Sequence, residues 1–407
     1  MQILTRLRIQ PAFWISPILA IISAYYLTLV PVGPIRYRLG DWIDGTEVLM
    51  FLAPAAGALA AYECGRLRDS HLVEYPGVRY RISVIGNVIG PATILVSIIA
   101  YGAGAFHSGS LLPPWEVAVG VISTVGCFAL IGGAFGCLAR RAISVPLMLV
   151  VGYLWMVMPG AVQPYWIRNL NGSWIGCCGI ESELSATVFW AGTIQNLAIA
   201  LAALVLITTV GNQRRAIWIS IAIIIPLAAA FIGAASTSDV GPTADVERST
   251  PLVCSSSDEV TYCTWPEISD DDGNVAAIIA SVRTDWKRAG FDSPGTYRAI
   301  TTSPSEVVFM IIPDAPDIDI RQSLTNAVVN HLPVCAENPS GYAPALDPIE
   351  LWLLRRSGVN ANTDVPGVTE LVQRIEQKSP AKQAAWLDRT LNAIANCGDV
   401  SPEAMEP

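Results

Sequence analysis

Seven long apolar runs, separated by short polar segments, make up most of the first 235 residues of the chain. A helix that crosses the hydrocarbon core of a bilayer needs about 20 apolar residues, with a tolerance of roughly 17–25. Each run falls in this range, and we therefore expect a membrane-embedded bundle that is entirely α-helical. The expected spans lie near residues 11–30, 46–62, 84–105, 115–138, 143–160, 187–209 and 216–235.

The pattern changes after residue 235. The polar stretch 236–250, STSDVGPTADVERST, predicts an unstructured linker. Alternating apolar positions at 297–303 and 306–312 predict two strands. Helices are expected at 274–289, 319–332, 347–357, 366–378 and 380–396. Residues 251–407 should therefore form a soluble α+β domain, which at this length can bury an adequate core.

Charge divides the chain in the same way. Charged residues make up only 14% of the sequence, against roughly 25% in average soluble proteins. Residues 1–235 contain 13 arginines, no lysine and 9 acidic residues, whereas residues 236–407 contain 12 basic and 25 acidic residues. The acidic second part argues against nucleic-acid binding, which requires clustered Lys and Arg.

The arginines also predict an orientation, because Lys and Arg accumulate in cytoplasmic loops. With a cytoplasmic N-terminus, ten arginines fall on the cytoplasmic side: Arg6, Arg8, Arg66, Arg68, Arg79, Arg81, Arg140, Arg141, Arg214 and Arg215. Three fall outside: Arg36, Arg38 and Arg168. Seven spans then place the domain 251–407 outside the cytoplasm. The span 46–62 is the shortest, and without it that domain would lie on the other side.

The loop between the second and third spans, Tyr62–Ser83, is the most charged segment of the membrane part and reads YECGRLRDSHLVEYPGVRYRIS. Two interpretations are open. The loop either docks a cytoplasmic partner, or its arginines only set the orientation of the protein.

Few polar groups lie inside the expected spans. Asp, Glu, Lys and Arg do not occur near the middle of any span, whereas ion-driven carriers place such residues there. Gln195 and Asn196 are the main polar pair within a span; they either line a transport pathway or form the more common helix–helix hydrogen bonds. The outer loop 162–185 contains Trp166 and Trp174, which either sit at the membrane interface or belong to a re-entrant turn.

The domain 251–407 contains four cysteines, and an even number on the oxidising side of a membrane indicates disulfides. Three connectivities are possible. We favour Cys254–Cys263 because they are close in sequence and Cys335–Cys397 by elimination; metal binding is disfavoured because no C-x-x-C spacing occurs. The adjacent Cys177 and Cys178 could pair with each other, pair with the distal domain or stay reduced.

Common catalytic and nucleotide-binding motifs are missing from the sequence. It contains no G-x-x-x-x-G-K-[ST] phosphate loop, no H-E-x-x-H zinc motif and no G-x-S-x-G nucleophile elbow. Asp314, Asp317 and Asp319 lack the glycine and the closing glutamate of an EF-hand. We therefore expect a chain without catalytic residues, without a metal site and without a cofactor of its own.

The order of the features resembles a known transporter plan. The segment E-C-G-R-L-R at 63–68, followed by V-E-Y-P-G-V-R at 73–79, a basic turn at Arg140–Arg141 and the loop 162–185, is similar to the permease subunit of ABC-2-type ATP-binding-cassette transporters. The resemblance covers roughly residues 1–210. The seventh span and the C-terminal domain, with C-T-W-P-E at 263–267, resemble an actinobacterial variety of this permease with a C-terminal extracytoplasmic domain.

This resemblance implies a function. The chain would be the permease of an exporter in a bacterial plasma membrane, with six helices of the ABC-2 type plus a seventh. A separate ATP-binding-cassette subunit would bind ATP and Mg²⁺, and a second copy or a homologous permease would complete a dimer. Coupling to the ATPase would involve Glu63, Arg66, Arg68, Asp69, Glu74 and Arg79.

Further partners would be membrane lipids and an accessory or cargo protein at the exterior domain. The alternative function is a multi-pass membrane sensor or assembly scaffold, whose extracytoplasmic domain binds a ligand or a protein. A Walker-motif ATPase encoded in the neighbouring reading frame would favour transport, and a kinase or sigma-factor regulator there would favour sensing.

Overall fold

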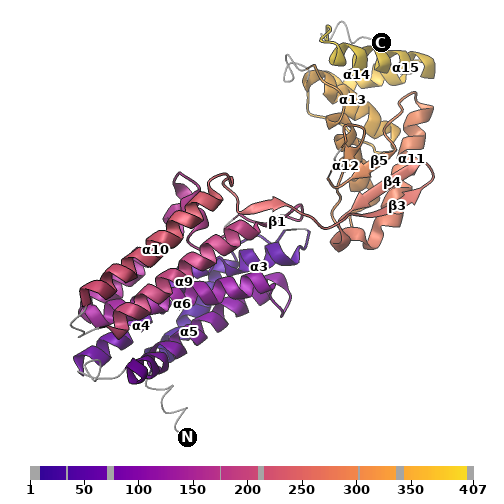
Figure 1. Cartoon of the computed structure of the whole chain (residues 1–407). Helices are drawn as coiled ribbons and strands as arrows, with labels where there is room; N and C mark the ends of the chain where they lie inside the picture. The colour runs from indigo at the N-terminus through magenta and orange to yellow at the C-terminus, as the bar shows by residue number, and fades with distance from the viewer. Residues whose placement is uncertain are drawn as a thin grey trace. The chain divides into compact units, whose positions relative to one another are not determined.

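The chain divides into two compact units, Met1–Arg248 and Ser249–Pro407 (Figure 1). The computed structural model describes residues 10–33, 35–70, 78–174, 176–209, 215–300, 303–335 and 343–400. The two units are described separately below.

The first unit is built from long helices (Figure 1), and each predicted span corresponds to one of them. They are α2 (Pro11–Leu27), α4 (Leu49–Asp69), α5 (Val78–Ser108), α6 (Trp115–Leu138), α7 (Arg141–Val157), α9 (Ala186–Thr208) and α10 (Arg215–Thr237). Within the described residues, five segments are long and apolar enough to cross a membrane: Ile85–Ser108, Trp115–Leu138, Arg141–Ala161, Ala186–Thr208 and Ala216–Thr237. The chain is therefore a membrane protein.

The second predicted span differs most from its expected form. A short helix, α3 (Arg38–Thr46), precedes α4 and is bent from it by 46°, so that the two together could form one broken span. The indole of Trp42 on α3 packs directly against Gly104 of α5, where a Cβ would collide with the ring. Since α2 has only 17 residues, the total of seven spans stays a prediction.

Helix α4 lies at the centre of the bundle, where it packs against α2, α5, α6 and α7. Every residue from Leu52 to Ala61 is buried, and most of them are alanine or glycine. The neighbouring helix α6 contributes Gly132 and Gly136, four residues apart, at positions where a Cβ would collide with the backbone of Gly57 and Ala61. Small residues at this spacing allow two helix backbones to approach closely.

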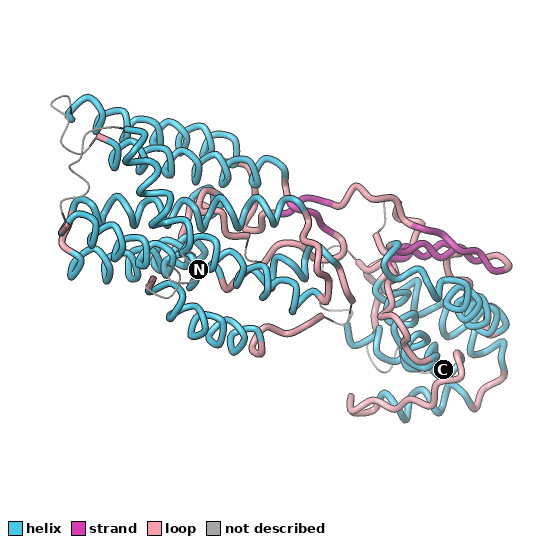
Figure 2. Tube along the Cα trace, turned by 90° about the horizontal axis from the view of Figure 1, so that it is seen from below, coloured by secondary structure: helices cyan, strands magenta, loops and turns pink. Residues whose placement is uncertain are grey.

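A small sheet lies at one end of this bundle (Figure 2). Strand β1 (Ser182–Leu184) pairs antiparallel with β2 (Asp245–Glu247). Residues 245–247 therefore belong to a strand, and the prediction of an unstructured linker over 236–250 is wrong at this point. The loop between α7 and β1 contains the short helices η2 (Met158–Ala161) and α8 (Trp166–Asn169).

The second unit contains a four-stranded sheet in the order β3-β4-β5-β6. Its strands are β3 (Val253–Ser257), β4 (Val260–Thr264), β5 (Thr296–Arg298) and β6 (Val307–Val308). β3 and β4 form an antiparallel hairpin, and the other two pairs are parallel. A short 3₁₀ helix, η3 (Pro266–Asp271), and then α11 (Asp272–Arg288) connect β4 to β5, and α11 packs on β3 and β4. Both predicted strands are present but shorter than expected.

Four more helices complete the second unit: α12 (Asp317–Asn330), α13 (Ala343–Arg356), α14 (Val368–Glu376) and α15 (Pro380–Ala395). Their core is aromatic. The indole of Trp286 donates to the Leu353 carbonyl at 2.9 Å, and Trp352 packs edge-on against Trp386 with ring centroids 6.1 Å apart. The prediction of a helical membrane part followed by an α+β domain is confirmed at this level.

Candidate functional site

Four of the predicted coupling residues, Glu63, Arg66, Arg68 and Asp69, lie on the last two turns of α4. Arg66 pairs with Glu63 one turn earlier, with 3.4 Å between Nη1 and Oε1, and Arg68 lies 2.9 Å from Asp69. The sequence predicted a loop from residue 62 onward, but α4 continues through Asp69, so this segment is the end of a helix whose preceding turns are buried.

Arg141, at the start of α7, completes this cluster. Its Nη2 lies 2.8 Å from Oδ2 of Asp69, and its guanidinium lies over the ring of Tyr62, 5.6 Å from the centroid. Gly65 makes room for it, because a Cβ at this position would collide with the Arg141 side chain. The sequence assigned Arg141 to the cytoplasmic side and to a basic turn, but not to a contact with α4. A glycine between charged residues, at Gly65, was the one sequence signal for this contact.

The other two predicted coupling residues are not placed in the cluster. Glu74 lies outside the described residues, and Arg79 belongs to the first turn of α5, where its side chain is not described. The structure therefore brings together four of the six predicted residues, with Arg141 in addition. Together with Arg140, which is exposed next to Arg141 in the sequence, the described group contains four arginines and two carboxylates.

The predicted pathway residues Gln195 and Asn196 are both buried on α9. Asn196 donates from Nδ2 to the hydroxyl of Thr124 on α6 at 3.1 Å, which is the helix–helix hydrogen bond that the sequence left as one of two options. The Oε1 of Gln195 is buried and accepts no hydrogen bond from the residues that the structure describes. Gln195 is therefore the member of the pair that has spare hydrogen-bonding capacity.

The loop 162–185 packs into the bundle. Asn171 donates to the carbonyl of Met156 at 3.2 Å and accepts from the backbone of Ser173 at 2.7 Å. Trp174 is buried against α6 at Gly120, where a Cβ would collide with the indole. Of the two options from the sequence, this loop resembles the re-entrant turn, because Asn171 bonds to the end of α7 and Trp174 is buried against α6.

All six cysteines that the sequence analysis discussed form disulfides. Cys254 pairs with Cys263 across the β3–β4 hairpin, and Cys335 pairs with Cys397 after α15. These are the pairs that the sequence favoured. Cys177 and Cys178 are paired with each other, which was one of their three options.

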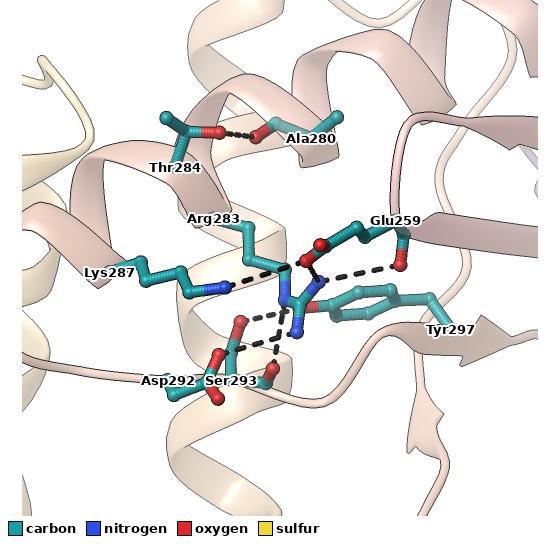
Figure 3. Close-up of polar contacts among 8 residues, drawn as sticks. All are labelled: Glu259, Ala280, Arg283, Thr284, Lys287, Asp292, Ser293 and Tyr297. Carbon is teal, nitrogen blue, oxygen red and sulfur yellow. Dashed lines mark hydrogen bonds and ion pairs between the residues drawn. The ribbon is translucent and has the colours of Figure 1, made fainter.

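A polar cluster in the second unit surrounds Arg283 of α11 (Figure 3). Its Nη1 lies 3.4 Å from the Glu259 carboxylate and its Nη2 lies 3.3 Å from Asp292, while Nε donates to the Ser293 carbonyl at 3.0 Å. The hydroxyls of Ser293 and Tyr297 share a hydrogen bond of 3.1 Å, and burial raises the pKa of Tyr297. Since each nitrogen of Arg283 has a partner, it ties the hairpin turn to α11.

The acidic residues of the second unit do not gather into a metal site. Asp317 and Asp319 lie in the first turn of α12, where their negative charges interact favourably with the helix dipole. Across the described ranges, no group of three or more His, Cys, Asp or Glu side chains could hold a metal ion.

Comparison with known proteins gives one match. No curated protein and no solved structure matches this chain. Residues 262–397 match a sequence family described as "Domain of unknown function (DUF7224)", so that this part of the second unit, from β4 to Cys397, is similar to that family.

Proposed function

We propose that this protein is the permease subunit of an ATP-driven exporter of the ABC-2 type. A separate ATP-binding subunit would dock on the charged end of α4, which includes Glu63, Arg66 and Arg68, on the cytoplasmic side. The observation that carries the proposal is the charged end of α4, which is bonded to α7 through Asp69 and Arg141 at 2.8 Å.

This arrangement suits mechanical coupling. Helix α4 contacts four other helices of the bundle, and its close packing on α6 at Gly132 leaves little room for the two helices to slide past each other. A displacement of the docked end would therefore move α4 as a rigid element. The ion pair to Arg141 would transmit the same movement to the start of α7.

The ATPase itself must be a partner. The sequence contains no phosphate-binding loop, so ATP and Mg²⁺ would be bound by the second chain, whose groove would accept a helix end with charges of both signs. A second copy of the permease, or a homologous one, would complete the pathway. The second unit would lie outside the cytoplasm, where its disulfides are stable, and would bind an accessory or cargo protein.

Co-purification tests the docking assignment. We would purify the full chain from the membranes of its native host, identify the co-purifying ATP-binding-cassette subunit, and then replace Glu63, Arg66 and Arg68 together by alanine. We expect the ATPase to be lost from the purified complex. As a control, Arg38→Ala at the other end of the bundle should leave the complex intact.

If the triple variant retains the ATPase, the docking assignment is wrong. If the unmodified chain instead captures a signalling kinase through the same residues, the alternative function as a membrane sensor is favoured.

A further inference from the structure

An apolar groove of about 370 Å³ runs between α2, α4 and α7 of the first unit. It is lined by Ile15 and Leu19 of α2, Ala58 and Tyr62 of α4, and Leu149 of α7, among others. The Tyr62 hydroxyl is the one polar group among the lining side chains. A groove of this composition, on a membrane-embedded bundle, is suited to a hydrocarbon chain.

The groove has the length of an acyl segment. Its lining on α2 extends from Pro11 to Leu19, and eight residues of helix rise about 12 Å. Half of the hydrocarbon core of a bilayer is about 15 Å thick. One acyl chain of a single leaflet could therefore occupy most of the groove.

One end of the groove is positively charged. Tyr62 closes this end, and the guanidinium of Arg141 lies over its ring. Arg140 is exposed next to it and forms no ion pair with any residue that the structure describes. Because the cluster contains two arginines more than carboxylates, an anionic group would be attracted here, and each arginine near a membrane surface contributes about a five-fold change in binding.

We propose that this groove binds one acyl chain of an anionic phospholipid, whose phosphate lies against Arg140 and Arg141. A second copy of the chain is the less suitable occupant. Two copies with the same membrane orientation would bring their positive ends together across a symmetric contact at this face, whereas an anionic lipid neutralises the excess charge.

Native mass spectrometry of the full chain in mild detergent tests this proposal, with phosphatidylglycerol and phosphatidylcholine of identical acyl chains as probes. We expect phosphatidylglycerol to bind at least five-fold more tightly. Arg140→Gln should weaken phosphatidylglycerol about five-fold and leave phosphatidylcholine unchanged. Arg38→Gln, at the other end of the bundle, is the matched control and should change neither.

Two variants test the groove itself. Ala58→Leu fills the groove from the α4 side, and Ile15→Trp fills it from its exposed rim. If the buried Ala58→Leu variant misfolds, the Ile15→Trp variant still tests the groove. Both should weaken binding of the two lipids alike. Gly126→Leu is the control, because an added Cβ at Gly126 would have no atom within 4 Å. This variant should bind both lipids as the unmodified protein does.

A phosphatidylglycerol with a photoreactive acyl chain should label α2, α4 and α7. Equal binding of the two lipids, unchanged binding to Ile15→Trp, or labelling confined to α9 and α10 would overturn the proposal. Crosslinking of two copies across the groove with exclusion of the lipid would overturn it as well.

Discussion

Asp69 and Arg141 form the ion pair that joins the end of α4 to the start of α7, with 2.8 Å between their charged atoms. The two residues are 72 positions apart in the sequence. The aliphatic part of Arg141 fits against Gly65, so that the position of the guanidinium is set by packing as well as by charge. In the proposed transporter, this pair is the point at which a docked ATPase would act on two helices at once.

Removing this ion pair should separate docking from coupling. Both side chains are 39% exposed, and exposed ion pairs contribute little to stability. Asp69→Asn and Arg141→Gln should therefore leave the melting temperature nearly unchanged and retain the ATPase, while transport per ATP hydrolysed falls. Transport and ATP hydrolysis in proteoliposomes measure this. A normal ratio in both variants would show that the pair has no part in coupling.

The contact between α4 and α6 should not tolerate a side chain at Gly132. A Cβ there would collide with the backbone of Gly57, and overpacking a tightly packed core costs about 1–3 kcal/mol. We expect Gly132→Val to lower the melting temperature of the detergent-purified protein. Gly126→Ala, on the same helix but with nothing within 4 Å, should have the melting temperature of the unmodified protein.

The two disulfides of the second unit should differ in their contribution to stability. Cys335 and Cys397 are 62 residues apart, and Cys254 and Cys263 are 9 apart. In the chain-entropy description these loops correspond to roughly 4 and 2.5 kcal/mol. We therefore expect Cys335→Ser with Cys397→Ser to destabilise the second unit more than Cys254→Ser with Cys263→Ser, in chemical unfolding of the full chain.

The same cysteines report the side of the membrane. In an extracytoplasmic domain they should resist alkylation in intact cells until a reductant is added. Alkylation without a reductant would contradict the proposed orientation.

Stability of the second unit should depend on the protonation of Glu350. Burial, and then the charge of Asp347, raises the pKa of Glu350 above its usual value. The folded state therefore binds this proton more tightly than the unfolded chain, so that the contribution of Glu350 to stability is fully present below about pH 4 and is lost as pH rises through the raised value.

Glu350→Gln removes this titration. We expect the variant to be at least as stable as the unmodified protein at pH 7 and to show a smaller decline in melting temperature between pH 4 and pH 7. Glu370→Gln, at an exposed position of α14, is the control. An unchanged pH dependence in Glu350→Gln would contradict the expectation.

Local patterns in the sequence determined most of the element types. The predicted helices of the second unit begin and end within a few residues of α11 to α15, because apolar periodicity depends on the chain itself. The runs of apolar residues located every long helix of the first unit, since hydrocarbon excludes charged side chains along the whole span. The Cys254–Cys263 pair followed from proximity, because the two residues face each other in one hairpin.

Contacts between distant segments were decided only by the tertiary structure. Helix α3 was missed because its short amphipathic segment is adjacent to a longer apolar run, and β2 was missed because it is a strand only by pairing with β1. The partner of Asp69 could not be read from the sequence, since no local periodicity relates the end of α4 to the start of α7. Separation along the chain does not indicate which helix ends contact each other. These contacts depend on how side chains and small residues such as Gly65 and Gly132 fit between the packed helices.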